Sequence, residues 1–185
     1  MRRSREEAAQ TRQRIVTSAA AEFRKNGIVA TGLAEVMNGA GLTHGGFYKH
    51  FESKDQLVAE ACAEAVKTVI FERMAAAASA GGEPVTTYLS TDHRDNPAAG
   101  CPLSAIGSEL SRSDEKTRQV ATAGFLELVE IMAGQYTNLK PAAARRRALV
   151  AVSTMIGALT MSRIVADPGL SGEIIKETQK SLTDD

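Results

Sequence analysis

The sequence of 185 residues contains no tryptophan, and aromatic residues make up only 4% of it, so an aromatic cage for a cationic ligand is not indicated. Its two cysteines, Cys62 and Cys101, are too few for a disulfide scaffold and lack the spacing of zinc ligands. No apolar run approaches the roughly 20 residues that a membrane span needs, and the N-terminus lacks the apolar stretch of a signal peptide. These absences favour a protein of the reducing cytoplasm without a membrane partner.

Net charge is also absent, because 22 basic residues balance 22 acidic ones. A chain that binds nucleic acid is usually basic, so the average alone argues against such a partner. The charge is unevenly distributed, however. Residues 1–54 carry nine basic and five acidic side chains, whereas residues 55–185 carry 13 and 17. The first part is therefore basic enough to attract phosphate.

The alternation of apolar and polar residues that marks β-strands is missing, whereas alanine, the best helix former, occurs 30 times. The sequence predicts an all-α protein of about nine helices, with a polar loop over Thr91–Pro97. The expected helices span residues 5–26, 33–40, 43–51, 54–80, 85–89, 102–110, 114–139, 141–165 and 171–183.

Two short helices near the N-terminus, joined by a glycine-containing turn, have the pattern of a helix-turn-helix motif. Asn26-Gly27 ends the helix that precedes them. In the second short helix Phe47 and Phe51 are four residues apart, and we expect them to face inward and to contact Ile15 and Phe23.

The order and spacing of these residues resemble the TetR family of bacterial transcriptional regulators. The resemblance covers about 50 residues, from Thr11-Arg12 through Asn26-Gly27 to Leu57. It is carried most specifically by the run Gly41-Leu42-Thr43-His44-Gly45-Gly46-Phe47-Tyr48-Lys49-His50-Phe51. It implies a DNA-binding domain over residues 1–54 and an effector-binding and dimerisation domain over residues 55–185. The implied partners are a palindromic operator in double-stranded DNA, a small-molecule effector and a second copy of the chain, with no cofactor, no metal and no enzymatic activity.

The resemblance also implies which residues contact DNA. His44 matches a base-reading position at the leading end of the recognition helix, together with Thr43, Gly45 and Gly46. The positions that hold the phosphate backbone are matched by Tyr48, Lys49, His50 and Lys54. Each of these residues also has an ordinary alternative, because Tyr48 could be a packed aromatic residue and the lysines could be solvated charges. Departures from the family pattern are Gly32 at the cap of the first short helix and Met37 at the crossing of the two short helices.

An operator with two-fold symmetry requires a dimer, and the family pairs its last two helices with their copies. The predicted interface residues are Val152, Ile156, Leu159, Arg163, Ile174 and Thr178. The alternative is that the apolar helix over residues 141–165 is fully buried within one chain.

The middle helices are expected to enclose the effector, although bulky apolar residues there could equally form only the core. The candidate lining residues are Phe71, Met74, Tyr88, Leu103, Ile106, Phe125, Val129 and Met132.

Cys101 allows a different hypothesis. Gly100-Cys101-Pro102 places its sulfur at a helix N-terminus, where the helix dipole favours the thiolate, so the chain could be a redox- or electrophile-sensing regulator. Alternatively, Cys101 is a small buried residue. A remote third possibility is a small helical enzyme that pairs Cys101 with His93, but no third orienting group stands at a recognisable spacing.

Overall fold

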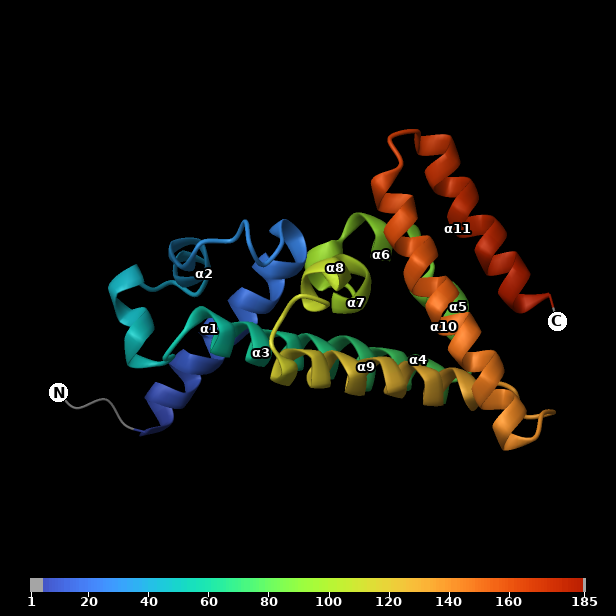
Figure 1. Ribbon diagram of the computed structural model, residues 1–185, viewed down its shortest axis with the longest axis horizontal. Coiled ribbons are helices and arrows are strands. Elements are labelled where there is room, and N and C mark those ends of the chain that lie inside the picture. Colours follow the sequence, from blue (N-terminus) through green and yellow to red (C-terminus); the bar gives the residue numbers. More distant parts are fainter. Residues whose placement is uncertain (1–4, 185) are drawn as a thin grey trace.

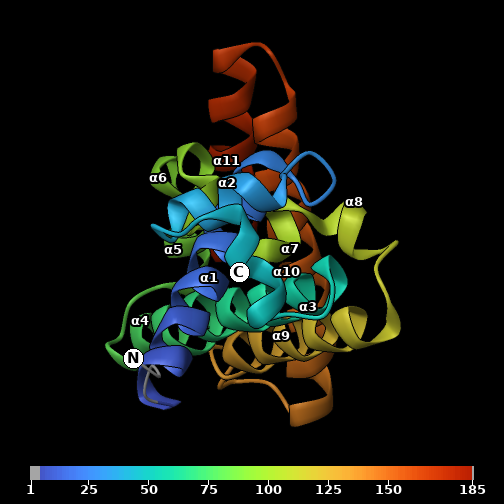
Figure 2. The ribbon, with the colours of Figure 1, turned by 90° about the vertical axis from the view of Figure 1, so that its left-hand side faces the viewer.

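The computed structural model describes residues 5–184, and all the regular secondary structure in that range is helical (Figure 1). The predicted all-α class is confirmed. The molecule is elongated, with a three-helix head at one end and, at the other, a helical hairpin formed by the last two helices, residues 141–183 (Figure 1). Viewed from the head end, the same hairpin stands behind the head (Figure 2).

The head consists of α1 (Arg5–Asn26), α2 (Leu33–Gly39) and η1 (His44–Lys49). Gly27 follows α1 with a φ of 90°, a conformation that glycine adopts without strain. The element η1 is a 3-10 helix, so the predicted α-helix over residues 43–51 is wrong in type. Gly45 and Gly46 weaken α-helix propensity there, and bonds to the third preceding residue close the turns instead.

A long helix links the head to the body as three consecutive elements, α3 (Lys54–Ala65), η2 (Val66–Met74) and α4 (Ala75–Ser79). Ser53 begins it, because its hydroxyl accepts a hydrogen bond of 3.1 Å from the Gln56 N–H. Its middle, η2, is wound as a π-helix, which the sequence did not predict. Such wide turns are rare and are frequently found at functional sites.

Short helices form the centre of the body: α5 (Pro84–Tyr88), α6 (Thr91–Asp95), η3 (Pro97–Ala99), α7 (Pro102–Ala105) and α8 (Gly107–Leu110). The loop predicted over Thr91–Pro97 is therefore largely helical. The Ser90 hydroxyl accepts a hydrogen bond from the His93 N–H, which caps α6. The helix predicted over residues 102–110 is interrupted at Ile106.

Three longer helices complete the body: α9 (Glu115–Ala133), α10 (Pro141–Ile164) and α11 (Pro168–Thr183). Contrary to the sequence expectation, α10 is long and apolar enough to cross a membrane by length and composition. It packs against α9 and α11 and buries Val152, Met155 and Leu159, as a core helix of a globular protein does.

One continuous hydrophobic core runs through head and body, from Ile15 in α1 to Ile175 in α11. In the middle of the body α9 lies along η2. A Cβ atom at Gly124 of α9 would lie 2.8 Å from the Val66 side chain, so this close approach requires glycine. The long helix is therefore packed tightly on the body as well as on the head.

Candidate nucleic-acid interface and body cavity

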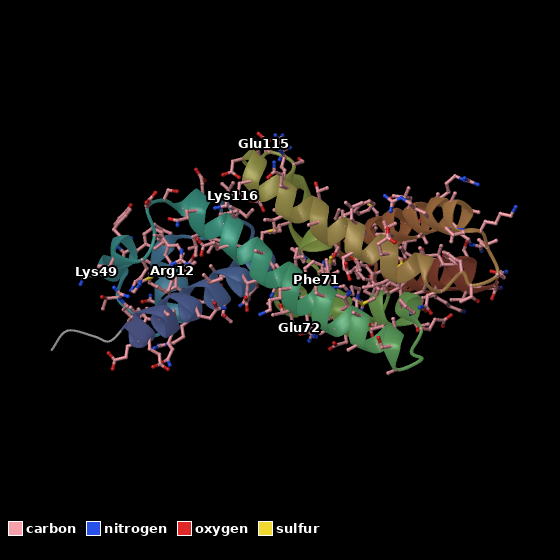
Figure 3. The ribbon with its side chains drawn as sticks, turned by 90° about the horizontal axis from the view of Figure 1, so that it is seen from below. Arg12, Lys49, Phe71, Glu72, Glu115 and Lys116 are labelled. Carbon is pink, nitrogen blue, oxygen red and sulfur yellow. The ribbon has the colours of Figure 1, made fainter. Side chains whose placement is uncertain are left out.

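The element η1 presents the predicted DNA-binding residues on the outside of the head. Thr43, His44, Gly45 and Lys49 are exposed, and Tyr48 is 70% exposed, so it is not a packed core residue. Lys49 lies at the head end of the described residues, far from the helical hairpin (Figure 3). Gly46 and His50 are half-buried behind this row. The exposed side chains offer a hydroxyl, an imidazole, a phenol and an ammonium group to a nucleic acid.

The inward face of η1 anchors it to the head. Phe47 and Phe51 are buried, and their rings stack with centroids 5.5 Å apart. Both belong to the same core as Ile15 and Phe23, which confirms that they face inward. Because the two rings are fixed, the exposed residues between them are held in one orientation.

Arg12 in α1 supports the same element, and the sequence reasoning assigned it no role. Its Nε donates a hydrogen bond of 3.3 Å to the His50 carbonyl, and its guanidinium lies 4.4 Å from the centre of the Phe51 ring. The other end of the guanidinium forms a bidentate pair with Glu60 of α3, including a 2.6 Å bond from Nη2 to Oε1. The hydrogen bonds from Arg12 lower the pKa of the Glu60 carboxyl. Arg12 thus ties η1 to the start of the long helix.

Lys54 has a different setting from the predicted phosphate contact. Its Nζ donates hydrogen bonds of 2.6 Å to the Ile28 carbonyl and 2.7 Å to the Thr31 carbonyl. These bonds hold the turn between α1 and α2 against α3. The reason lies in tertiary structure, because the two carbonyls belong to residues more than 20 positions away.

Met37, which departs from the family pattern, lies opposite Gly46 where α2 and η1 cross. Met37 is fully buried, and a Cβ atom at Gly46 would lie 3.4 Å from its terminal methyl group. Met37 of α2 and Gly46 of η1 therefore face each other at the crossing of the two helices. The other departure, Gly32, offers no capping hydroxyl, and the Glu35 carboxylate accepts the Gly32 N–H at 2.8 Å.

The body contains a cavity of about 150 Å³ between η2, α5, α6 and η3. Of the predicted lining residues only Met74 and Tyr88 border it. Ile106, Val129 and Met132 are buried in the core, Leu103 and Phe125 pack against it, and Phe71 lies on the surface of η2 (Figure 3). Most of these residues were misplaced because apolar character cannot distinguish a core position from a cavity wall.

Cys101 is completely buried, and this burial raises the pKa of its thiol. The expectation of a stabilised thiolate at a helix N-terminus is therefore wrong. Desolvation disfavours the charged sulfur more than the nearby backbone N–H groups favour it. The setting matches the alternative interpretation of Cys101 as a small buried residue. Cys62 is buried too, and its pKa is raised to about 11 by desolvation.

His93 lies close to Cys101 but is not arranged to activate it. Its Nε2 accepts a hydrogen bond of 2.8 Å from the Cys101 backbone N–H, so its Nδ1 carries the proton and donates to the Tyr88 carbonyl at 2.7 Å. Both ring nitrogens are thus engaged by backbone groups. Burial lowers the pKa of His93 to about 4, which keeps the ring neutral. This arrangement holds a loop and does not resemble a nucleophile–base pair.

The outward surface of the hairpin differs from the predicted dimer interface. Val152 and Leu159 face the core, and Arg163 donates hydrogen bonds to the carbonyls of His93 and Arg94. Ile156 is half-buried. The prediction chose the wrong stripe of an apolar helix, because α10 is apolar on more than one side.

The exposed stripe of α10 consists of Val150, Thr154, Gly157, Met161 and Ile164, which recur at alternating intervals of four and three residues. Leu170, Ile174 and Thr178 of α11 continue it, and Thr154, Leu170, Ile174 and Thr178 line a common hollow. We call these eight residues the α10–α11 face. Two of the predicted interface residues, Ile174 and Thr178, belong to it.

Comparison with known proteins shows which families and proteins this chain is similar to. The model of the bacterial regulatory proteins of the tetR family matches residues 15–61, which include the whole of α2 and η1. The model of the C-terminal domain of LmrA/YxaF-like transcriptional regulators matches residues 84–169. An HTH-type transcriptional regulator of Mycobacterium tuberculosis is 30% identical over 175 residues, which cover 84% of this chain and 86% of that protein.

The chain belongs to the TetR family of bacterial transcriptional regulators.

Further relatives agree with this assignment. A probable acrEF/envCD operon repressor of Escherichia coli is 39% identical over 59 residues, covering 32% of this chain and 27% of that protein. The crystal structure of a TetR transcriptional regulator from Chloroflexus aurantiacus superposes with a TM-score of 0.74 at 25% identity, covering 97% and 98% of the two chains. As a member of this family, the protein is a DNA-binding transcriptional regulator and not an enzyme.

Proposed function

We propose that this TetR-family protein is a dimeric repressor that binds a palindromic operator and is released from it by a small-molecule effector. Residues 1–54 form the DNA-reading domain, and residues 55–185 bind the effector and form the dimer. The observation that carries the proposal is the exposed row Thr43, His44, Gly45, Tyr48 and Lys49, fixed from behind by two buried phenylalanines. The repressor assignment is supported by the E. coli operon repressor among the relatives.

The exposed residues of this row are proposed to contact DNA in two ways, some at the bases and others at the phosphates. His44 stands at the start of η1, where a recognition element approaches base edges, and its imidazole can donate to guanine or accept from adenine or cytosine. Tyr48 and Lys49 would hold phosphates, which sets the register but carries no sequence information. Lys54 would add its positive charge behind the row while it holds the turn after α1.

The dimer is proposed to form through the α10–α11 face. The 4-3 spacing of its exposed α10 residues is the spacing with which two helices pack side by side. Val150 and Ile164 are each 66% exposed, so the apolar stripe is uncovered in the single chain. A two-fold axis through this face would join two basic heads beneath an acidic body. Operator DNA lies in the cytoplasm, where we therefore place the protein.

The experiment is the selection of DNA from a random pool with the purified full chain, followed by titration of the selected site. We expect a palindrome whose half-sites lie roughly one helical turn, about 34–36 Å, apart. The dissociation constant should rise steeply with salt, because phosphate contacts release counterions. Binding that is independent of salt and sequence would overturn the proposal.

Lys49→Gln tests the interface directly. It should weaken binding to all sequences and lower the salt slope by about 1 per protomer. Lys25→Gln is the matched control, because Lys25 is exposed in the last turn of α1, away from η1, and carries the same charge. His44→Ala should instead relax the preference at one base position of each half-site. Equal effects of Lys25→Gln and Lys49→Gln would contradict the proposed interface.

A further inference from the structure

The body cavity is lined by apolar and by polar side chains. Of its lining residues, Val69, Met74 and Tyr88 are buried, whereas Arg73 and Asp92 are exposed and His93 is half-buried. Its volume of about 150 Å³ matches a cavity that accommodates one benzene-sized group. The cavity therefore suits a compact ligand with an apolar part and a polar end.

The surroundings of the cavity carry an excess of positive charge. The guanidinium groups of Arg24, Arg73 and Arg163 all donate to carbonyl or hydroxyl oxygens, and within residues 5–184 none of the three forms an ion pair. The carboxylate on the wall, Asp92, accepts a hydrogen bond from the Asn96 side chain at 2.8 Å. The neighbouring Asp95 is paired with Arg94. The neutral state of His93 agrees with this environment, because Arg163 and Arg73 add to the effect of burial in lowering its pKa.

Arg73 is the guanidinium that can receive a ligand. It is exposed on η2 and lines the cavity, and its Nη1 donates a hydrogen bond of 2.7 Å to the Ala99 carbonyl. A carboxylate in bidentate geometry takes two of the guanidinium's N–H donors in charge-assisted bonds, which are stronger than the bond to the neutral Ala99 carbonyl and can replace it. The presence of Asp92 on the same wall disfavours a doubly charged phosphate.

The residue before Ala99 connects the cavity to the head through its carbonyl group. The Ala98 carbonyl accepts hydrogen bonds from Arg24 of α1, from Nε at 2.8 Å and from Nη2. Arg24 is only 9% exposed, and its Nη1 is buried without a partner. Since Ala98 supplies its only acceptor among the described residues, the position of η3 determines how the end of α1 is held. Sequence periodicity could have indicated this inward position, because Arg24 follows Ala20 and Phe23 on the buried side of α1.

We propose that the cavity binds a small monocarboxylate, with the carboxylate on Arg73 and the apolar group against Tyr88, Met74 and Val69. The bound carboxylate replaces the Ala99 carbonyl as the partner of Arg73. This exchange frees η3 and so loosens the hold of Ala98 on Arg24. Arg24 is then a positioning residue that transmits occupancy of the cavity to the DNA-reading head. The inference rests on the proposed effector-released repressor and names the chemical class of its effector.

Ligand binding is tested without DNA, by calorimetric titration of the full chain with benzoate and hexanoate and with their neutral amides. We expect at least one carboxylate to bind once per chain and to bind at least tenfold more tightly than its amide. Arg73→Gln should abolish this preference. Lys67→Gln is the matched control, because Lys67 is an exposed cation on the same helical segment outside the cavity lining. The absence of saturable binding by either carboxylate, or equal binding of acid and amide, would overturn the ligand class.

The coupling is tested on the selected operator by fluorescence anisotropy. The carboxylate that binds should weaken operator binding by the wild-type chain at least fivefold. With Arg24→Gln and Arg24→Lys, carboxylate affinity should stay within about twofold of wild type while its effect on operator binding shrinks. In the wild-type chain, hydrogen exchange of the peptide over residues 96–101 should accelerate on carboxylate binding.

The outcomes separate the two proposals. If the chain binds no specific DNA in the absence of carboxylate, the proposed function fails. If it binds its operator and the carboxylate, but the carboxylate changes neither operator affinity nor exchange over residues 96–101, the coupling through η3 fails and the repressor proposal stands.

Discussion

Gly157 is the position at which the proposed dimer can be tested without disturbing the single chain. It lies in the middle of the α10–α11 face, and a Cβ atom added there meets no atom within 4 Å. Replacing glycine within a helix also removes a penalty of up to about 1 kcal/mol. Gly157→Arg should therefore leave the folded single chain as stable as before, or more stable.

In the dimer the same substitution places a guanidinium from each protomer in an apolar contact. The exposed side chains around it, Val150, Met161, Ile164 and Leu170, are each 45–66% exposed, so covering them contributes about 1–2 kcal/mol apiece. An unpaired charge buried among them costs about 3 kcal/mol or more. Two such charges per dimer raise the dimer dissociation constant by a factor of about 10⁴ or more.

Sedimentation equilibrium measures this change directly. We expect a wild-type dimer and a Gly157→Arg monomer with an unchanged helical circular dichroism spectrum. The melting temperature of the wild-type chain should rise with protein concentration, whereas that of the variant should not. Ala123→Arg, at an exposed position of α9, is the control and should remain dimeric. A dimeric Gly157→Arg protein would refute the assignment of the α10–α11 face.

Three further predictions concern the head, the long helix and the cavity. Lys54→Met should lower the free energy of unfolding by about 1–3 kcal/mol in urea titrations, because two carbonyls lose their donor, whereas Lys49→Gln should leave it unchanged. Gly124→Ala should destabilise the chain by about 1–2 kcal/mol, because the clash with Val66 costs more than the roughly 1 kcal/mol gained by replacing a helical glycine; an unchanged urea midpoint would contradict the close approach of α9 and η2. Burial lowers the pKa of His93 from 6.5 to about 4, so the unfolded chain binds more protons between these values. The resulting stability of about 3 kcal/mol should be fully present above pH 6.5 and be lost as the pH falls toward 4, and His93→Gln should remove this pH dependence.

The parts of the fold that could be predicted from the sequence are those that local rules determine. Asn26-Gly27 ends α1 at the expected residue, and the spacing of Phe47 and Phe51 correctly predicts their burial. In both cases the decisive groups lie within a few residues of one another. The surroundings of η1 were less predictable, because Gly46 approaches Met37 of another helix, where a Cβ atom would lie 3.4 Å from the terminal methyl group.

The site residues that have unexpected partners share a different cause. Lys54 and Arg163 were assigned to external partners, yet both donate to backbone carbonyls of distant segments. A sequence shows that a basic side chain exists, but not which unpaired carbonyl the fold will bring to it. The stripe of α10 that faces the core was likewise indistinguishable by composition from the stripe that faces outward.

The segment over residues 91–101 shows how hydrogen bonds from distant basic side chains to backbone carbonyls bear on function. Its polar composition predicted a solvated loop, yet it holds the neutral His93 ring, supplies the carbonyls that Arg24, Arg73 and Arg163 bind, and forms one wall of the cavity. Backbone carbonyls that are turned away from water need hydrogen-bond donors, and here three cations from α1, η2 and α10 provide them. Because neutral carbonyls leave the charge of these cations uncompensated, the site has a standing preference for an anion. An anion that binds one of these arginines removes a hydrogen-bond donor from the segment. The segment can then shift relative to the other two arginines, and we propose that occupancy of the cavity alters the position of the head in this way.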